Sequence, residues 1–218
     1  MPMFRGIRLV IYDLDGVLID SNKAILESFR RTFDEVGEPF FPDLILSRIG
    51  VSLPQIFIDT LPEKYHGRIE ELRQTYIRNF QSLDRSFIKL LPDVTETLTK
   101  VKDREFMQSL ATNKTVTEAE RILNELGVLN YFDLLAGFLS VARPKPEPDM
   151  ILYLLDKLGV EPWEAVFIDD TSWGLTAGIK AGVHTVGITT GNNTLRQIES
   201  VEPDTVIHRL SDLTDIIE

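Results

Sequence analysis

The sequence predicts an α/β fold in which helices flank a parallel sheet and a block of further helices is inserted after the first strand. Short apolar runs rich in β-branched residues recur along the 218-residue chain, and helical patterns separate the later runs. One long segment near the N-terminus shows helical periodicity only. With 43% hydrophobic and 26% charged residues, the composition is that of a globular protein and excludes disorder as the dominant state.

The first strand is predicted at residues 7–12 (IRLVIY), a nearly continuous apolar run. Such runs are typical of strands that are covered on both faces, as in parallel sheets. Similar runs predict four further strands, at residues 106–111, 134–138, 165–169 and 184–188.

Helices are predicted between the later strands, where apolar residues recur every three or four positions. One pattern ends before Gly127 and another ends before Gly159, and glycine is the preferred residue just after a helix. Strands alternating with helices of this length indicate βαβ units.

Residues 21–90 interrupt this alternation and are expected to form a helical insertion. One apolar stripe ends at Gly37, another runs from Ile69 to Leu83, and prolines punctuate shorter helices between them. The insertion has ten basic and ten acidic residues, so the net charge of −11 belongs to the rest of the chain.

This acidic balance makes a nucleic acid or an anionic membrane an unexpected partner. The absence of Cys excludes disulfides and thiolate chemistry. The N-terminal apolar run is interrupted by Arg8 and lacks the pattern of a signal peptide, and no stretch reaches the length of a membrane span. We therefore expect a cytoplasmic protein, and the sequence indicates no oligomeric state.

Polar residues follow the predicted strands where ligands bind in open parallel sheets, at the carboxyl ends. Asp13 and Asp15 follow the first strand in the segment DLDGVLID, and Asp169 and Asp170 end the fourth. Each pair alone also suits a solvated turn or a polar strand end. Their occurrence together favours a site.

Two further polar segments fit the same edge of the sheet. Thr112 and Asn113 follow the second strand, and Lys145 lies in the proline-rich loop RPKPEPD. A helix cap and a surface lysine are the simpler interpretations of these residues taken singly.

With these segments the chain resembles the haloacid dehalogenase superfamily, in particular its phosphoglycolate phosphatase-like members with a helical cap after the first strand. The resemblance rests on DLDGVLID, on ATNK at 111–114, on RPKPEPD, and on Asp169-Asp170 followed by GLTAGIKAG. It implies a Rossmann-like catalytic core at residues 1–20 and 91–218 and a cap at residues 21–90.

The resemblance also implies a Mg²⁺-dependent phosphatase. Asp13 would be the nucleophile that forms an aspartyl-phosphate, and Asp15 the general acid and base. Thr112, Asn113 and Lys145 would hold the phosphoryl oxygens. Oxygen ligands suit Mg²⁺, and the implied set is Asp13, the backbone carbonyl of Asp15, Asp170 and Asp169.

Position 174 and Arg48 bear on the metal site and on substrate binding respectively. Many relatives have a second acid four residues after the metal-binding one, and this chain has Gly174 there. Arg48 lies where capped relatives often present a substrate-specificity loop, which makes it a candidate for binding the far end of the substrate, although a solvated arginine is the simpler interpretation.

The expected substrate is a small phosphorylated metabolite, either a phosphoglycolate-like monoester or pyrophosphate. A sugar phosphomutase is the alternative enzyme, since such relatives share the first and fourth motifs. A catalytically silent binding protein of the same fold is the alternative from another class. Dehalogenase activity is disfavoured because haloacid relatives typically lack the acid that Asp15 supplies.

Overall fold

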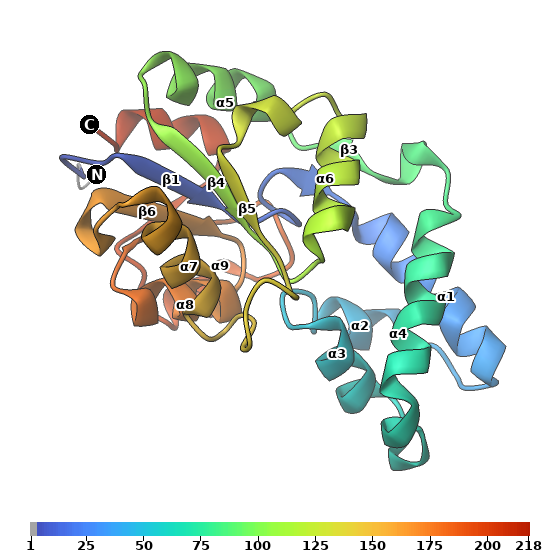
Figure 1. Ribbon diagram of the computed structural model, residues 1–218. Helices are drawn as coiled ribbons and strands as arrows, with labels where there is room; N and C mark the ends of the chain where they lie inside the picture. The colour runs from blue at the N-terminus through green and yellow to red at the C-terminus, as the bar shows by residue number, and fades with distance from the viewer. Residues whose placement is uncertain (1–3) are drawn as a thin grey trace.

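The core of the chain is a six-stranded sheet in which every neighbouring pair of strands is parallel (Figure 1). The computed structural model describes residues 4–218. The predicted α/β class is confirmed. In spatial order the strands are β5 (Leu134–Ala136), β4 (Met107–Ala111), β1 (Leu9–Tyr12), β6 (Ala165–Asp169), β7 (His184–Ile188) and β8 (Thr205–Ile207).

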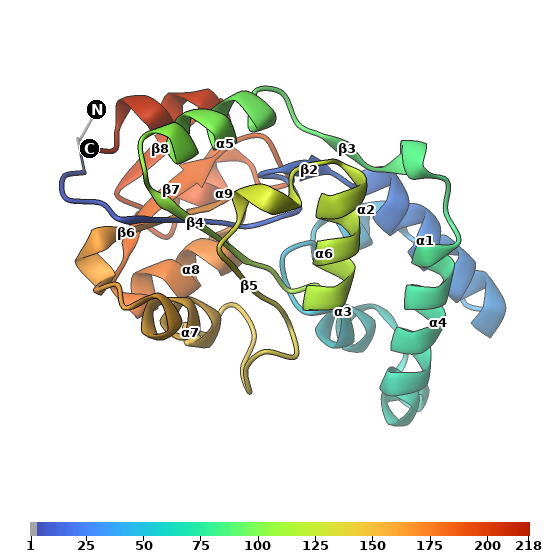
Figure 2. The ribbon, with the colours of Figure 1, turned by 45° about the horizontal axis from the view of Figure 1, so that its top comes forward.

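Both faces of the sheet are covered. On β1, Val10 and Tyr12 join one apolar cluster while Leu9 and Ile11 join the other, as the alternation of side chains along a strand requires. Figure 2 shows α5 and the C-terminal segment above the sheet and α7 and α8 below it. The core helices are α5 (Val94–Asp103), α6 (Val116–Glu125), α7 (Asp149–Leu158), α8 (Ser172–Ala181) and α9 (Leu195–Glu199).

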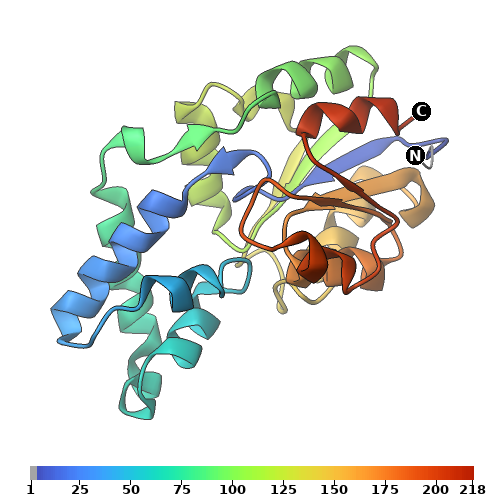
Figure 3. The same ribbon diagram turned by 180° about the vertical axis from the view of Figure 1, so that it is seen from behind.

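The segment predicted to be helical contains four α-helices, which lie beyond the carboxyl ends of the central strands and away from the described ends of the chain (Figures 1 and 3). Phe29 and Tyr76 join the two longest helices, with ring centroids 4.7 Å apart. The helices are α1 (Asn22–Val36), α2 (Pro42–Leu46), α3 (Leu53–Thr60) and α4 (Ile69–Gln81).

A short antiparallel ribbon, β2 (Ile19–Asp20) and β3 (Lys89–Leu90), connects the insertion to the sheet. The two segments by which the chain enters and leaves the insertion therefore lie side by side, at the predicted limits of residues 21–90. The division of the chain into a core and a cap stays a prediction.

Five 3-10 helices complete the described secondary structure, and they lie at Glu63–Arg68, Arg85–Phe87, Leu129–Tyr131, Pro162–Glu164 and Leu210–Asp215. Over residues 4–218, no helix has the length and apolar character that crossing a membrane requires.

Candidate active site

The three central strands bring the predicted polar residues together. Asp13 directly follows β1, Thr112 follows β4, and Asp169 ends β6. β4 and β6 are the two neighbours of β1, so their carboxyl ends meet at one edge of the sheet. This edge faces the helical insertion, and Asp13, Thr112 and Asp170 all line one cavity there.

Lys145 links two of the acids. Its Nζ donates to Asp13 Oδ1 at 2.7 Å and to Asp169 Oδ2 at 2.8 Å, and the residue is 3% exposed. Burial opposes the positive charge, but the two carboxylates outweigh burial and hold the pKa of Lys145 above its ordinary value. The lysine therefore supplies a positive charge between the two acids.

Asp13, Asp169 and Asp170 form a buried cluster in which each offers a carboxylate oxygen, and these oxygens lie within 4.8 Å of one another. Burial raises the pKa of Asp13 to about 7, with Lys145 lowering it and Asp169 and Asp15 raising it. The pKa of Asp170 is raised as well, mainly by burial and then by its acidic neighbours. Several carboxylates buried together favour a bound cation, because buried negative charge without a partner is costly.

The hydrogen bonds separate the two acids of the fourth motif. Asp169 is satisfied, because Oδ1 accepts from the backbone and hydroxyl of Thr171 and Oδ2 accepts from Lys145. Asp170 accepts at Oδ2 from the Asn192 backbone at 2.9 Å, while its buried Oδ1 has no partner among the described residues. Asp170 thus offers a free oxygen, and Asp169 orients the lysine.

Glycines allow this close packing. A Cβ on Gly16 would lie 2.5 Å from Asp170 Oδ2, and one on Gly191 would lie 1.7 Å from the same atom. A Cβ on Gly174 would lie 1.7 Å from Asp169 Oδ2. The absence of a second acid at Gly174 therefore has a steric reason: in this chain Asp169 occupies the space that any side chain there would need.

Asp15 is held by two neighbours. Ser21 donates to Asp15 Oδ1, and Lys114 Nζ lies 2.9 and 2.8 Å from the two carboxylate oxygens. Lys114 was not among the predicted site residues, although its place directly after Thr112 and Asn113 at a strand end could have indicated it. The ammonium group keeps Asp15 in one orientation beside Asp13.

Asn113 contacts the loop of the insertion. Its Nδ2 donates to the Gly50 carbonyl at 2.9 Å and to the Lys145 carbonyl at 3.2 Å, while its buried Oδ1 has no partner among the described residues. The amide thus connects the insertion with the loop that carries Lys145. A role for Asn113 in holding phosphoryl oxygens stays a prediction.

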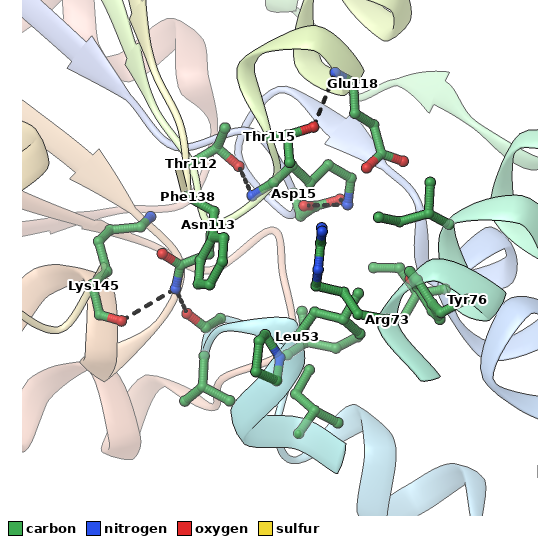
Figure 4. Close-up of a pocket in the computed structure, with 18 of the residues that line it drawn as sticks. Asp15, Leu53, Arg73, Tyr76, Thr112, Asn113, Thr115, Glu118, Phe138 and Lys145 are labelled. Atoms are coloured by element: carbon green, nitrogen blue, oxygen red, sulfur yellow. Dashed lines mark hydrogen bonds and ion pairs between the residues drawn. The ribbon is translucent and has the colours of Figure 1, made fainter. Parts of the chain in front are cut away.

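The cavity of about 90 Å³ lies between the sheet and the insertion (Figure 4). Asp15, Thr112, Asn113 and Lys145 line it from the sheet side. The described residues of its lining do not include Arg48, whose Nε lies 3.5 Å from Asp59 Oδ2. Its role in binding substrate is untested.

Besides Lys114, two charged residues of the cavity were not predicted. Glu118 lies on α6, and burial raises the pKa of its carboxyl, with Lys114 lowering it. Its buried Oε1 has no partner in the described part of the chain. Arg73 projects from α4 into the cavity. Both residues occur within ordinary amphipathic helices, where the sequence does not distinguish them from solvated charges.

A family model described as haloacid dehalogenase-like hydrolase matches residues 10–188, most of the chain. The chain belongs to this family. The match begins in β1 and ends with β7, so it includes the acids, Thr112, Asn113 and Lys145 of the site, while Gly191 and Asn192 lie just beyond it.

Similar proteins support the assignment. A phosphoglycolate phosphatase of Aquifex aeolicus is 31% identical over 213 residues, which cover 97% of each chain. The pyrophosphatase PpaX of Oceanobacillus iheyensis is 26% identical, again over 97% of each chain. Among solved structures, a haloacid dehalogenase-like hydrolase from Bacteroides fragilis superposes with a TM-score of 0.89 at 25% identity, covering 95% of this chain and 99% of the other.

Proposed function

We propose that this protein is a Mg²⁺-dependent phosphatase that hydrolyses a small phosphorylated metabolite through an aspartyl-phosphate on Asp13. The observation that carries the proposal is the convergence of Asp13, Lys145 and Asp170 at one end of the cavity. A carboxylate nucleophile, a buried cation and a free acidic oxygen are the groups that phosphoryl transfer needs.

The donor set suits Mg²⁺. Asp13 and Asp170 offer carboxylate oxygens, and Asp170 Oδ1 is buried without a partner among the described residues, which is costly unless a cation occupies its lone pairs. Asp13, Asp170 and the carbonyl of Asp15 would hold the ion. Asp169 is already bonded to Thr171 and Lys145, so it would hold Lys145 in place beside the ion. When bound, Mg²⁺ would neutralise the repulsion between the carboxylates and the phosphoryl group.

Asp13 makes the first bond. One carboxylate oxygen attacks phosphorus while the bond to the leaving oxygen breaks, and Lys145 holds the other oxygen. Asp15 acts in its protonated form as the general acid and gives that proton to the leaving oxygen. In the second step Asp15 takes a proton from water, the water oxygen attacks phosphorus, and the bond between phosphorus and the Asp13 oxygen breaks, which frees the carboxylate and releases phosphate. General acid and base catalysis of this kind contributes on the order of a hundred- to ten-thousandfold.

The phosphoryl oxygens need donors that are already in place. The Lys145 ammonium and the Thr112 hydroxyl both line the cavity, and Thr112 Oγ1 accepts from the Lys114 backbone, which leaves its own proton free to donate. Donors fixed before the reaction stabilise the transition state without reorganising.

The named relatives point to the substrate class. One is a phosphoglycolate phosphatase and another a pyrophosphatase, and both substrates are small, in keeping with a cavity of about 90 Å³. We therefore propose a phosphoglycolate-like monoester or pyrophosphate as the substrate.

A metabolite screen tests the proposal. Phosphate release is measured from phosphoglycolate, pyrophosphate and hexose phosphates, with Mg²⁺ and with a chelator. We expect Mg²⁺-dependent release that Asp13→Asn abolishes and that Asp156→Asn, a change at an exposed acid of α7, leaves intact. Isomerised hexose phosphate without free phosphate would indicate a mutase. No turnover of any substrate would contradict an enzymatic function.

A further inference from the structure

The insertion supplies a charge to the cavity through Arg73. All other described residues that line the cavity from the insertion are uncharged, and most are apolar, such as Phe29, Leu53 and Ile77. Figure 4 shows the Arg73 side chain extending from α4 into the space below Asp15. A guanidinium group in an otherwise uncharged wall marks one place for a negatively charged ligand group.

The ion pair of Arg73 leaves it able to bind a ligand. Nε and Nη2 donate to Glu70 at 2.8 Å each, whereas Nη1 has no acceptor among the described residues. The side chain of Arg73 is 13% exposed, but that of Glu70 is 70% exposed. An ion pair whose acid is in water is weak, so Glu70 orients the guanidinium without satisfying it.

Other cations near the cavity are already engaged. Lys145 bonds two acids of the cluster, and Lys114 bonds both oxygens of Asp15. An anionic group on the insertion side of the cavity would therefore find in Arg73 a cation that still has a free hydrogen-bond donor.

We propose that Arg73 binds a second negative charge, a carboxylate or a phosphate, on the leaving group of the substrate. This inference rests on the proposed phosphatase function and adds specificity to it. The site selects small esters or anhydrides whose leaving group is itself anionic, and it discriminates against neutral leaving groups of the same size. The planar fork of arginine suits both carboxylate and phosphate.

A matched pair of substrates tests the inference. Phosphoglycolate and hydroxyethyl phosphate have similar size and differ in the charge of the leaving group. Arg73→Met should lower kcat/KM for phosphoglycolate about 10- to 100-fold, the range for a lost charge-assisted hydrogen bond, and change that for hydroxyethyl phosphate by less than about twofold. Arg73→Lys should recover part of the loss, because the charge remains while the fork is lost.

A third substrate distinguishes the sources of the charge. The same loss with pyrophosphate would show that the site binds a phosphate leaving group, whereas loss with phosphoglycolate alone would show a carboxylate site. As a control, Arg78→Met removes a charge from the exposed side of the same helix and should leave kcat/KM unchanged for all three substrates.

Two outcomes overturn the inference. Equal losses on phosphoglycolate and hydroxyethyl phosphate would show that Arg73 does not recognise the charge. Full kcat/KM of both Arg73 variants on phosphoglycolate and on pyrophosphate would also show that Arg73 does not recognise the charge of the leaving group. An unmodified protein that releases no phosphate from any substrate would instead overturn the proposed function on which the inference rests.

Discussion

Replacing Lys145 with Met removes the ammonium group that bonds Asp13 at 2.7 Å and Asp169 at 2.8 Å. Methionine has a similar volume and no charge, so the change leaves two buried carboxylates without this partner. Removing one member of a buried ion pair costs about 3 to 5 kcal/mol. We expect a loss of this size in the free energy of unfolding at about pH 8, measured without metal.

The loss should shrink as the pH is lowered. Burial already raises the pKa of Asp13 to about 7, and Lys145 lowers it, so the variant has a still higher value. A folded-state pKa above the unfolded one means that stability is present at low pH and is lost as the pH rises through the folded value. At about pH 5 a proton on Asp13 replaces the lost positive charge in the variant. The difference in the free energy of unfolding between the variant and the unmodified protein therefore becomes smaller.

Urea unfolding in a chelator, followed by circular dichroism at both pH values, measures this effect. Lys180→Met serves as the control, because its partner Glu147 is partly exposed and the lysine side chain is 41% exposed. Its cost should stay within about 0.5 kcal/mol. A loss below about 1 kcal/mol for Lys145→Met at about pH 8, or a loss that does not shrink at about pH 5, would refute the reasoning.

Three further changes have definite expected outcomes. Gly174→Ala places a methyl group 1.7 Å from the Asp169 carboxylate and should cost about 3 kcal/mol or more of stability, measured by urea unfolding. Mg²⁺ at a hundredfold excess over its Kd should raise the free energy of unfolding by about 2.7 kcal/mol, and Asp170→Asn should remove this gain. At one fixed Mg²⁺ concentration the gain should be larger at about pH 8 than at about pH 5, because the raised pKa of Asp170 lets protons compete with the metal and so raises its Kd. Asn113→Ala removes two hydrogen bonds and should destabilise the protein by about 1 to 3 kcal/mol, again measured by urea unfolding.

Matched controls separate these effects from general damage. Gly67→Ala meets no atom within 4 Å and should be close to neutral. Asp156→Asn changes an exposed acid and should keep the Mg²⁺ effect. Thr99→Ala removes a half-buried polar contact on α5 and should cost no more than about 1 kcal/mol in urea unfolding. A stable Gly174→Ala protein, or a full Mg²⁺ effect in Asp170→Asn, would contradict the packing and the metal assignment respectively.

Strands were predictable where the chain is buried on both faces. The runs at Ala165–Asp169 and His184–Ile188 have the predicted bounds, and nearly every residue in them is buried. At β5, an edge strand, the pattern misled: the run continues to Phe138, but the strand ends at Ala136. There the backbone turns, since the Gly137 nitrogen bonds the Ser140 hydroxyl. The strand at Thr205–Ile207 was missed because three residues show no usable period.

The site was predictable where chemistry and position coincide. Asp13 and Asp170 stand at strand ends and belong to recognisable segments, and the structure brings both to one cavity. Arg73 and Glu118 could not be selected, because helical periodicity tells which face of a helix is apolar but not which end of it reaches the sheet. Lys114 was overlooked for a different reason: its partner Asp15 is 99 residues away in sequence, and only the fold reveals the pair.

The central claim is that Asp13 carries the phosphoryl group between substrate and water. Acid quenching during turnover of radiolabelled phosphoglycolate or pyrophosphate, followed by proteolysis, tests it most directly. The account predicts a label on the peptide that contains Asp13, and none in Asp13→Asn, which should also release no phosphate. Full phosphate release by Asp13→Asn, or a label on any other residue of the unmodified protein, would contradict it.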